Sequence, residues 1–217
     1  EHMLHFGVEE GLSRHRRAAV AGWPSLVLPR VRWQTGRGAV KAEVWATVAL
    51  RVGLDQTRTP MAEMPIVVFA DGAAKGNPGP GGWGAIVVTP AGQVTELGGG
   101  ARHTTNNQME LTAVIEALRH LRTTPGAVAV YTDSTYVIRG IREWIHGWRR
   151  GGWKTAAGTD VLNPDLWEAL AGLTAARAQT GPITWHYVRG HTGVPGNERV
   201  DEIADGHATG RPPRLYR

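Results

Sequence analysis

Cysteine is absent from the 217-residue sequence, and this absence excludes disulfide bonds, thiolate nucleophiles and cysteine-ligated zinc. No apolar run approaches the roughly 20 residues that a membrane-spanning helix needs. No basic segment followed by an apolar one suggests a secretory signal. We therefore expect a cytoplasmic protein without a membrane anchor.

A broad excess of positive charge is missing from most of the chain. Residues 1–60 contain nine Lys and Arg residues against five Asp and Glu, so they carry +4 of the net charge of +5. Residues 61–217 carry only +1. Beyond residue 60, any binding of a polyanion must therefore rest on local basic patches.

Residues 1–63 differ in composition from the rest of the chain. Arginines recur up to Arg37, and no acidic residue occurs from residue 11 to residue 42, as in an organelle transit peptide. The apolar positions between Val40 and Val52 fit either a strand or a helix. We expect a basic N-terminal extension and leave its structure open.

Clear α/β patterning begins at Pro65. Apolar, β-branched runs predict strands at 65–71, 83–89, 93–99, 127–132 and 183–188. Helical periodicity predicts helices near 105–121, 134–145, 164–178 and 197–208. Three consecutive strands followed by alternating helices and strands indicate an α/β fold with a mixed sheet.

Three glycines, Gly79, Gly81 and Gly84, match the spacing of a dinucleotide-binding turn. That turn needs a helix directly after the glycines, whereas the mostly β-branched residues 85–89 predict a strand. We therefore interpret the glycines as part of a hairpin connection and expect no small-molecule cofactor. This interpretation leaves Asp71 at the end of the first strand, where an unpaired carboxylate is costly.

Two acidic residues follow apolar strands in the same way. Asp71 ends the first strand, and Asp133 directly follows the strand predicted at 127–132. If these strands are parallel neighbours, both side chains lie at the C-terminal edge of the sheet, where open α/β folds bind ligands. Asp133 could instead cap the helix that follows it, which is a structural role.

Two further candidate acids lie on predicted helices. Glu110 is followed at helical spacing by Ala113 and Val114, so it faces the packed side of its helix. Asp201 adjoins an apolar stripe, but Asp205 follows one turn later. Sequence spacing alone does not choose between Asp201 and Asp205.

Six motifs follow one another between residues 65 and 209: DGAAKGNPGPGGWGAI, TTNNQMEL, YTDSTYV, GWRRGGWKT, NPDLW and VRGHTGVPGNERVDEIA. In residue type and spacing they resemble the motifs of ribonuclease H, type 1. The resemblance implies a five-stranded mixed sheet flanked by helices, formed by a catalytic domain at 64–209 that is followed by a short tail at 210–217. It also implies an endonuclease that hydrolyses the RNA strand of RNA–DNA hybrids and leaves 5′-phosphate and 3′-hydroxyl ends.

The resemblance also assigns the catalytic residues. The metal-binding carboxylates would be Asp71, Glu110, Asp133 and Asp201. Each like-charge pair at about 4 Å costs roughly 4 kcal/mol at an effective dielectric constant near 20, so four carboxylates together need cations or protons. Oxygen ligands favour Mg²⁺ over zinc, with Mn²⁺ as a substitute, and a two-ion site would activate a water and stabilise the leaving oxygen. His191, in a glycine-flanked loop, resembles the mobile proton acceptor of the family.

Residues that would bind the hybrid fall into two groups. The segment WIHGWRRGGWK interleaves aromatic rings and cations. This pattern suits binding to a nucleic acid, because cations contact phosphates and rings stack, although the tryptophans could equally be core residues. We expect some rings to pack while the cations project, and the resemblance identifies this segment as a basic protrusion that grips the DNA strand. Its candidate residues are Trp144, Trp148, Arg149, Arg150 and Lys154.

The second group would read the groove. Amides offer both a donor and an acceptor to the 2′-hydroxyls that distinguish RNA. The residues that resemble groove readers are Asn77, Asn106 and Asn107. Those that resemble a phosphate pocket for the DNA strand are Thr105, near a helix N-terminus, and Asn163. Three positions depart from close relatives. Leu162 stands where they often carry Lys, Thr135 where they often carry Gln, and Ala74 where they often carry Cys or Ser.

Two other functions stay open at this point. One is a hybrid-binding module without catalysis, and the other is a metal nuclease of the same fold, such as an integrase or resolvase. The intact carboxylates oppose the first, and the basic protrusion with its asparagines opposes the second. We expect a monomer whose partner is an RNA–DNA hybrid, with residues 1–63 as an auxiliary nucleic-acid-contacting segment.

Overall fold

The structure, a computed structural model, describes residues 64–216. The basic extension predicted at 1–63, with its alternative strand, helix or transit peptide, lies outside the described residues. Within the described part, none of the helices is both long and apolar enough to cross a bilayer.

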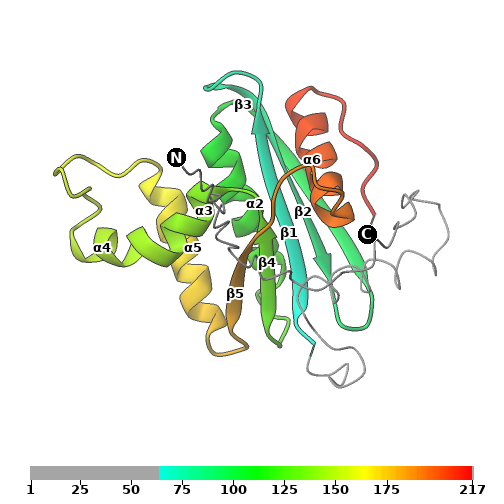
Figure 1. Cartoon of the computed structure of the whole chain (residues 1–217), viewed down its shortest axis with the longest axis horizontal. Coiled ribbons are helices and arrows are strands. Elements are labelled where there is room, and N and C mark those ends of the chain that lie inside the picture. The colour runs from blue at the N-terminus through cyan, green and yellow to red at the C-terminus, as the bar shows by residue number, and fades with distance from the viewer. Residues whose placement is uncertain (1–63, 217) are drawn as a thin grey trace, which may run out of the picture. The chain divides into compact units, whose positions relative to one another are not determined.

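The centre of the fold is a five-stranded sheet in the order β3-β2-β1-β4-β5 (Figure 1). Its strands are β1 (Ile66–Ala74), β2 (Gly79–Val88), β3 (Val94–Thr104), β4 (Val128–Thr132) and β5 (Ile183–Tyr187). The pairs β1–β2 and β2–β3 are antiparallel, whereas β1–β4 and β4–β5 are parallel. The predicted α/β fold with a five-stranded mixed sheet is therefore confirmed.

Helices cover both faces of this sheet. They are α2 (Asn106–His120), α3 (Thr135–Arg139), α4 (Ile145–Arg150), α5 (Pro164–Arg177) and α6 (Pro195–Ala208). The helix predicted at 134–145 is longer than expected, because a π-helical segment, η2 (Gly140–Trp144), joins α3 to α4. Gly140 allows a close approach there, since a Cβ atom on it would lie 1.9 Å from the Trp167 ring.

The alternation of β1 builds two apolar clusters on opposite faces. Val68 packs with residues of α2 and α5 in the larger cluster. Phe69 packs with Val200 of α6 in the smaller one. Because side chains alternate along a strand, Asp71 falls on the same face as Phe69, the face that α6 covers.

The glycines of β2 are part of the strand and not only of its hairpin connection, so the predicted strand start at residue 83 was wrong. Pairing with β1 and β3 reaches back to Gly81, and β2 begins at Gly79. A Cβ atom on Gly82 would lie 2.3 Å from the Ala204 carbonyl oxygen of α6. The missing side chains thus let α6 lie directly on the backbone of β2.

Candidate active site

Asp71 lies inside β1 and not at its end, contrary to the sequence expectation. The parallel pairing with β4 ends at Phe69, but β1 continues to Ala74 because β2 pairs with it further along. The Asp71 side chain is buried, at 8% exposure, and its Oδ1 accepts a hydrogen bond of 2.7 Å from the Gly72 backbone N–H. A carboxylate in this position is held rigidly at the edge of the parallel part of the sheet.

Asp133 directly follows β4, the parallel neighbour of β1, as the sequence predicted. It is not the cap of α3, because the N-cap is Ser134, whose hydroxyl accepts from the Val137 backbone N–H at 3.1 Å. The alternative structural role of Asp133 as a helix cap is therefore wrong. Its Oδ2 instead lies 3.5 Å from Asn197 Nδ2 of α6.

Glu110 projects from α2 towards the same edge and is half-buried, as its apolar neighbours predicted. The Ser134 hydroxyl donates a hydrogen bond to Glu110 Oε2. The Ser134 hydroxyl thus has two roles. Its oxygen accepts the capping hydrogen bond of α3, and its hydrogen is donated to the Glu110 carboxylate, which it orients.

Asp201 and Asp205 both project from α6 but have different partners. Asp201 Oδ2 lies 3.9 Å from His191 Nδ1, and its charge interacts with that of Asp133. Asp205 forms an ion pair with Lys75, at the start of the β1–β2 connection. The charge of Asp201 is thus coupled to the charges of Asp205 and Asp133, whereas Asp205 has Lys75 as its ion-pair partner.

The four carboxylates are electrostatically coupled. Burial, followed by the charges of Asp133, Asp201 and Glu110, raises the pKa of Asp71 to about 8, although the Gly72 N–H opposes the shift. Burial and then Asp133 raise the pKa of Glu110, against the Ser134 hydrogen bond. Burial raises the pKa of Asp201, an effect that His191 opposes. The charges of four acids, which come from β1, α2, the end of β4 and α6, thus influence one another.

The donor chemistry of this group fits a hard divalent cation, because the side chains of all four residues offer carboxylate oxygens. The negative charges of the group also call for a positive charge to balance them. Their present spacing does not enclose an ion. Within residues 64–216, no three His, Asp or Glu side chains converge closely enough to hold one. The group is a coupled cluster of oxygen donors and not a closed cage.

His191 lies in the loop between β5 and α6, with a side chain that is 83% exposed. Its backbone is in the left-handed region, at φ 53°, which a non-glycine residue adopts at a cost. An exposed imidazole beside Asp201 can accept or release a proton at the edge of the carboxylate cluster.

The groove-reading asparagines are partly brought together. Asn106 Oδ1 accepts from the Ala74 backbone N–H at 2.6 Å, and the Asn106 backbone N–H donates to Asn77 Oδ1 at 3.3 Å. Asn107 lies half-buried on the first turn of α2. Thr105 is the N-cap of α2, and its hydroxyl accepts from the Gln108 backbone N–H. These contacts join the β1–β2 connection to the positive end of α2.

The basic protrusion has a packed aromatic base. The ring centroids of Trp144 and Trp148 are 5.4 Å apart, and those of Trp148 and the buried Trp167 are 5.5 Å apart. Arg149 and Arg150 end α4 with exposed side chains. Figure 1 shows α4 and the loop after it extending beyond the sheet. The structure thus separates this group from the carboxylate cluster.

Lys154 of the protrusion and Asn163 of the predicted phosphate pocket both have partners within the chain. Lys154 is exposed but forms an ion pair with Asp160 across the loop that follows α4. Asn163, with φ 57°, begins α5, and its Nδ2 lies 3.4 Å from the Tyr136 hydroxyl. The neighbouring Leu162, one of the departures from relatives, is 73% exposed. Lys154 therefore projects, as the sequence suggested, but it has an acidic partner within the chain.

Sequence patterns missed three residues around the carboxylates: Ser134, Asn197 and Lys75. Only Ser134 had a readable signal, because a serine between a strand and a helix is a typical N-cap. Asn197 and Lys75 reach the site through contacts between distant segments. No local pattern predicts such contacts.

Comparison with known proteins adds independent findings. A family model described as RNase H matches residues 63–209. A protein named Ribonuclease H from Cupriavidus metallidurans is 56% identical over 140 residues, which cover 64% of this chain and 92% of that protein. A solved structure of LC9-RNase H1, described as a type 1 RNase H with the type 2 active-site motif, has a TM-score of 0.58 and 31% identity, covering 72% of this chain and 77% of that one. LC11-RNase H1, solved in complex with RNA/DNA hybrid, shares the fold with a TM-score of 0.50 at 24% identity, covering 64% of this chain and 94% of that one.

Proposed function

Because the chain belongs to the RNase H family, we propose that it is an endonuclease that hydrolyses the RNA strand of RNA–DNA hybrids. The observation that carries this proposal is the coupled group of four carboxylates, contributed by four separate elements around one edge of the sheet. A relative of the same fold was solved with an RNA/DNA hybrid, which supports the choice of substrate. Divalent metal ions are implied by the family.

We assign the metal-binding role to Asp71, Glu110, Asp133 and Asp201. Two Mg²⁺ ions, for which Mn²⁺ can substitute, would supply activation of a water and stabilisation of the leaving 3′-oxygen. Attack by water leaves a 5′-phosphate and a 3′-hydroxyl. Burial of Asp71 keeps one ligand rigid, and the Ser134 hydroxyl holds another, Glu110, in place.

His191 serves in this proposal as the mobile proton acceptor. Its imidazole is exposed, lies at the rim of the cluster and has Asp201 as its only charged neighbour at 3.9 Å among the described residues. A neutral imidazole can take a proton there and pass it to solvent.

Replacing His191 with alanine should lower kcat by about a hundredfold, because general acid–base groups typically contribute this much. KM for the hybrid should change little, since within residues 64–216 the exposed ring forms an ion pair only with Asp201. Steady-state kinetics on a labelled hybrid measure both constants. An unchanged kcat would remove His191 from the mechanism, and His120→Ala, at an exposed histidine in the last turn of α2, is the matched control.

Recognition of the hybrid is assigned to the asparagine cluster and the protrusion. Asn77, Asn106 and Asn107 would contact 2′-hydroxyls in the minor groove. Thr105 and Asn163 would hold phosphates of the DNA strand, the first at the positive end of α2. Trp144 and Trp148 support the exposed cations, which are Arg149, Arg150 and Lys154.

Asp160 weakens hybrid binding in this proposal, because it forms an ion pair with Lys154 in the free protein and competes with the phosphates of the hybrid. Asp160→Asn should tighten hybrid binding by about two- to fivefold at low salt, since exposed ion pairs are worth at most about 1 kcal/mol. Fluorescence anisotropy in the non-cleaving Asp133→Asn background measures the Kd. The gain should vanish when Lys154 is also replaced by glutamine. A gain that persists without Lys154 would show that Asp160 acts only through the general field.

The remaining assignments concern the whole chain. We propose that residues 64–209 form the catalytic unit and act as a monomer in the cytoplasm, and that residues 1–63 add nucleic-acid contacts. Deleting residues 1–63 should then weaken binding and lower its salt dependence. Unchanged affinity and salt dependence would exclude this role.

A panel of labelled substrates tests the proposed function. The purified chain is incubated with an RNA–DNA hybrid, single-stranded RNA, duplex RNA and duplex DNA in Mg²⁺. We expect cleavage of only the RNA strand of the hybrid. Binding of the hybrid without cleavage would support a non-catalytic module, and cleavage of duplex DNA would support an integrase- or resolvase-like nuclease.

A further inference from the structure

A buried ion pair joins α6 to the edge strand β3. Arg199 Nε donates a hydrogen bond to Glu96 Oε1, and Arg199 Nη2 donates one to Glu96 Oε2. Both donor–acceptor distances are 2.9 Å. The two side chains are 8% and 0% exposed. This bidentate pair links residues that are 103 positions apart in the sequence.

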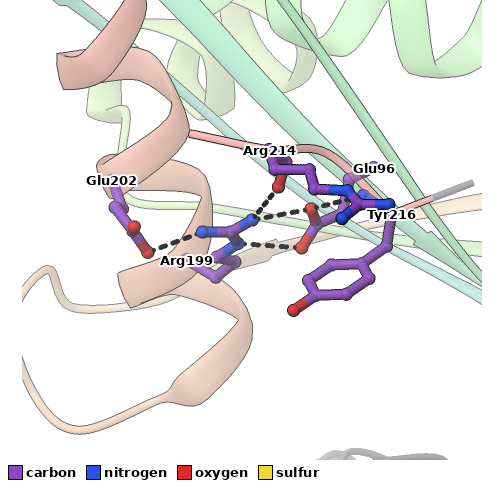
Figure 2. Close-up of polar contacts among 5 residues, drawn as sticks. All are labelled: Glu96, Arg199, Glu202, Arg214 and Tyr216. Carbon is purple, nitrogen blue, oxygen red and sulfur yellow. Dashed lines mark hydrogen bonds and ion pairs between the residues drawn. The ribbon is translucent and has the colours of Figure 1, made fainter. Parts of the chain in front are cut away.

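The last described residues of the chain complete this pair (Figure 2). Arg199 Nη2 also donates to the Arg214 carbonyl oxygen at 2.9 Å. The Tyr216 N–H donates to Glu96 Oε2 at 3.0 Å, and the Glu96 N–H donates to the Tyr216 carbonyl oxygen at 2.8 Å. The Arg199 guanidinium lies 5.7 Å from the centroid of the Tyr216 ring. We name Glu96, Arg199 and residues 211–216 the C-terminal clasp.

The clasp is also tied to the far end of α6. The Arg211 N–H donates to the Gly206 carbonyl oxygen at 2.7 Å, and a Cβ atom on Gly206 would lie 2.7 Å from Pro213. Nearer the start of the helix, Arg199 Nη1 donates to Glu202 at 2.8 Å. The segment after α6 therefore runs back along the helix and ends on β3.

Such a pair is a poor means of stabilisation but a good means of fixing position. The desolvation of two charges offsets most of their attraction, whereas leaving either charge unpaired in the interior is costly. The bidentate geometry and the extra backbone contacts are satisfied in only one placement of α6 over β3. Hydrogen bonding to Glu96 accordingly raises the pKa of Arg199 above its ordinary value.

This placement matters because α6 packs on side chains of β1 such as Phe69 but meets part of β2 at glycines. The helix lies against Gly82 and Gly84 of β2, which offer no side chains to interlock with it. Arg199 and Asp201 are two residues apart, so they point about 200° apart around the helix axis. A helix held at Arg199 on one side thus presents Asp201 at a defined position on the other.

We propose that the C-terminal clasp positions α6 so that Asp201 lies at the correct place relative to Asp71 and Asp133 for divalent metal binding. This inference rests on the proposed function of the carboxylate cluster. Arg199, Glu96 and Tyr216 are then positioning residues that touch neither metal nor substrate. Residues 211–216 lie beyond the span 63–209 that the family model matches.

Two variants of the full chain test the clasp. One ends at Gly210, which removes the tail contacts but leaves the Glu96–Arg199 pair intact. The other is Arg199→Gln, which breaks the pair itself. For each, the Mg²⁺ concentration that gives half of the maximal thermal shift is measured, together with kcat and KM for the hybrid as Mg²⁺ is varied, well below the melting temperature.

We expect the half-saturating Mg²⁺ concentration to rise about tenfold in both variants, as for other residues that orient metal ligands. KM for the hybrid should stay unchanged, and saturating Mg²⁺ should restore most of kcat. The matched control is Arg177→Gln on α5, because Arg177 is also buried and donates to backbone carbonyls, but away from α6. It should lower the melting temperature without changing the Mg²⁺ dependence.

Loss of thermal stability with an unchanged Mg²⁺ midpoint in the shortened chain would overturn the proposal, because the clasp would then be only structural. The same holds if Arg177→Gln raises the midpoint equally. A failure of the proposed function is distinguishable from both outcomes. In that case the parent chain itself would not cleave the hybrid, while the thermal shift would still report on Mg²⁺ binding.

Discussion

Replacing Asp133 with asparagine should abolish hybrid cleavage while leaving the fold intact. Asp133 follows β4 without capping α3, and its charge contributes to the raised pKa of Asp71 and Glu110. Removing that charge would remove one of the proposed metal ligands, and metal stabilisation of a transition state is worth several kcal/mol. A loss of about 4 kcal/mol corresponds to roughly a thousandfold lower kcat. Single-turnover cleavage of an end-labelled hybrid measures this loss.

Asp205→Asn is the matched control for the Asp133 variant. It removes a carboxylate that lies one turn from Asp201 but has Lys75 as its partner. We expect cleavage within a few-fold of the parent rate. A parent-like rate for Asp133→Asn, or a collapse for Asp205→Asn, would contradict the assignment of the carboxylates.

Replacing Asp71 with asparagine should stabilise the metal-free protein at pH 8 while it abolishes activity. The pKa of Asp71 is raised to about 8 in the folded state, against an ordinary value near 3.8. Between these two values the unfolded chain releases a proton that the folded chain retains, so the parent loses stability as the pH rises from about 4 to 8. Asparagine removes this cost, for a gain of about 1–5 kcal/mol at pH 8.

Urea unfolding in EDTA at several pH values measures the effect of Asp71→Asn. The difference in unfolding free energy between variant and parent should grow with pH across this window and should shrink when Mg²⁺ is added. Glu168→Gln, which removes an exposed carboxylate on α5, should show no such trend. A difference that does not depend on pH would show that Asp71 is not under strain from burial and its acidic neighbours.

Strand ends were the most informative part of the sequence. Asp71 and Asp133 follow apolar runs, and the expectation that these runs are parallel neighbours placed both acids at one edge of the sheet. Apolar neighbours also indicated the packed side for Glu110. For Asp201 against Asp205, periodicity could not decide, because both lie on one side of α6. The difference between them is a contact with Lys75, which is 130 residues away from Asp205.

Other features lay beyond local patterns for the same reason. The glycines around Gly82 were expected in a hairpin connection, but they pair with β1 and β3, and α6, which is distant in the sequence, packs on them. Glu96 carries no signal in the sequence, yet it is buried against Arg199 and the tail. Lys154 was expected to project, and the closure of its loop adds Asp160 as its ion-pair partner. Sequence periodicity predicts which face a residue takes but not which distant residue meets it.

The chemistry of the cut ends tests the carboxylate site most directly. A hybrid with 5′-labelled RNA is cleaved in Mg²⁺, and the fragments are compared with size markers that end in 3′-hydroxyl or in 2′,3′-cyclic phosphate. If the four carboxylates act through divalent ions on a water, all fragments end in 3′-hydroxyl and EDTA stops the reaction. Fragments that end in cyclic phosphate, or cleavage that persists in EDTA, would contradict it, because the neighbouring 2′-hydroxyl would then be the nucleophile.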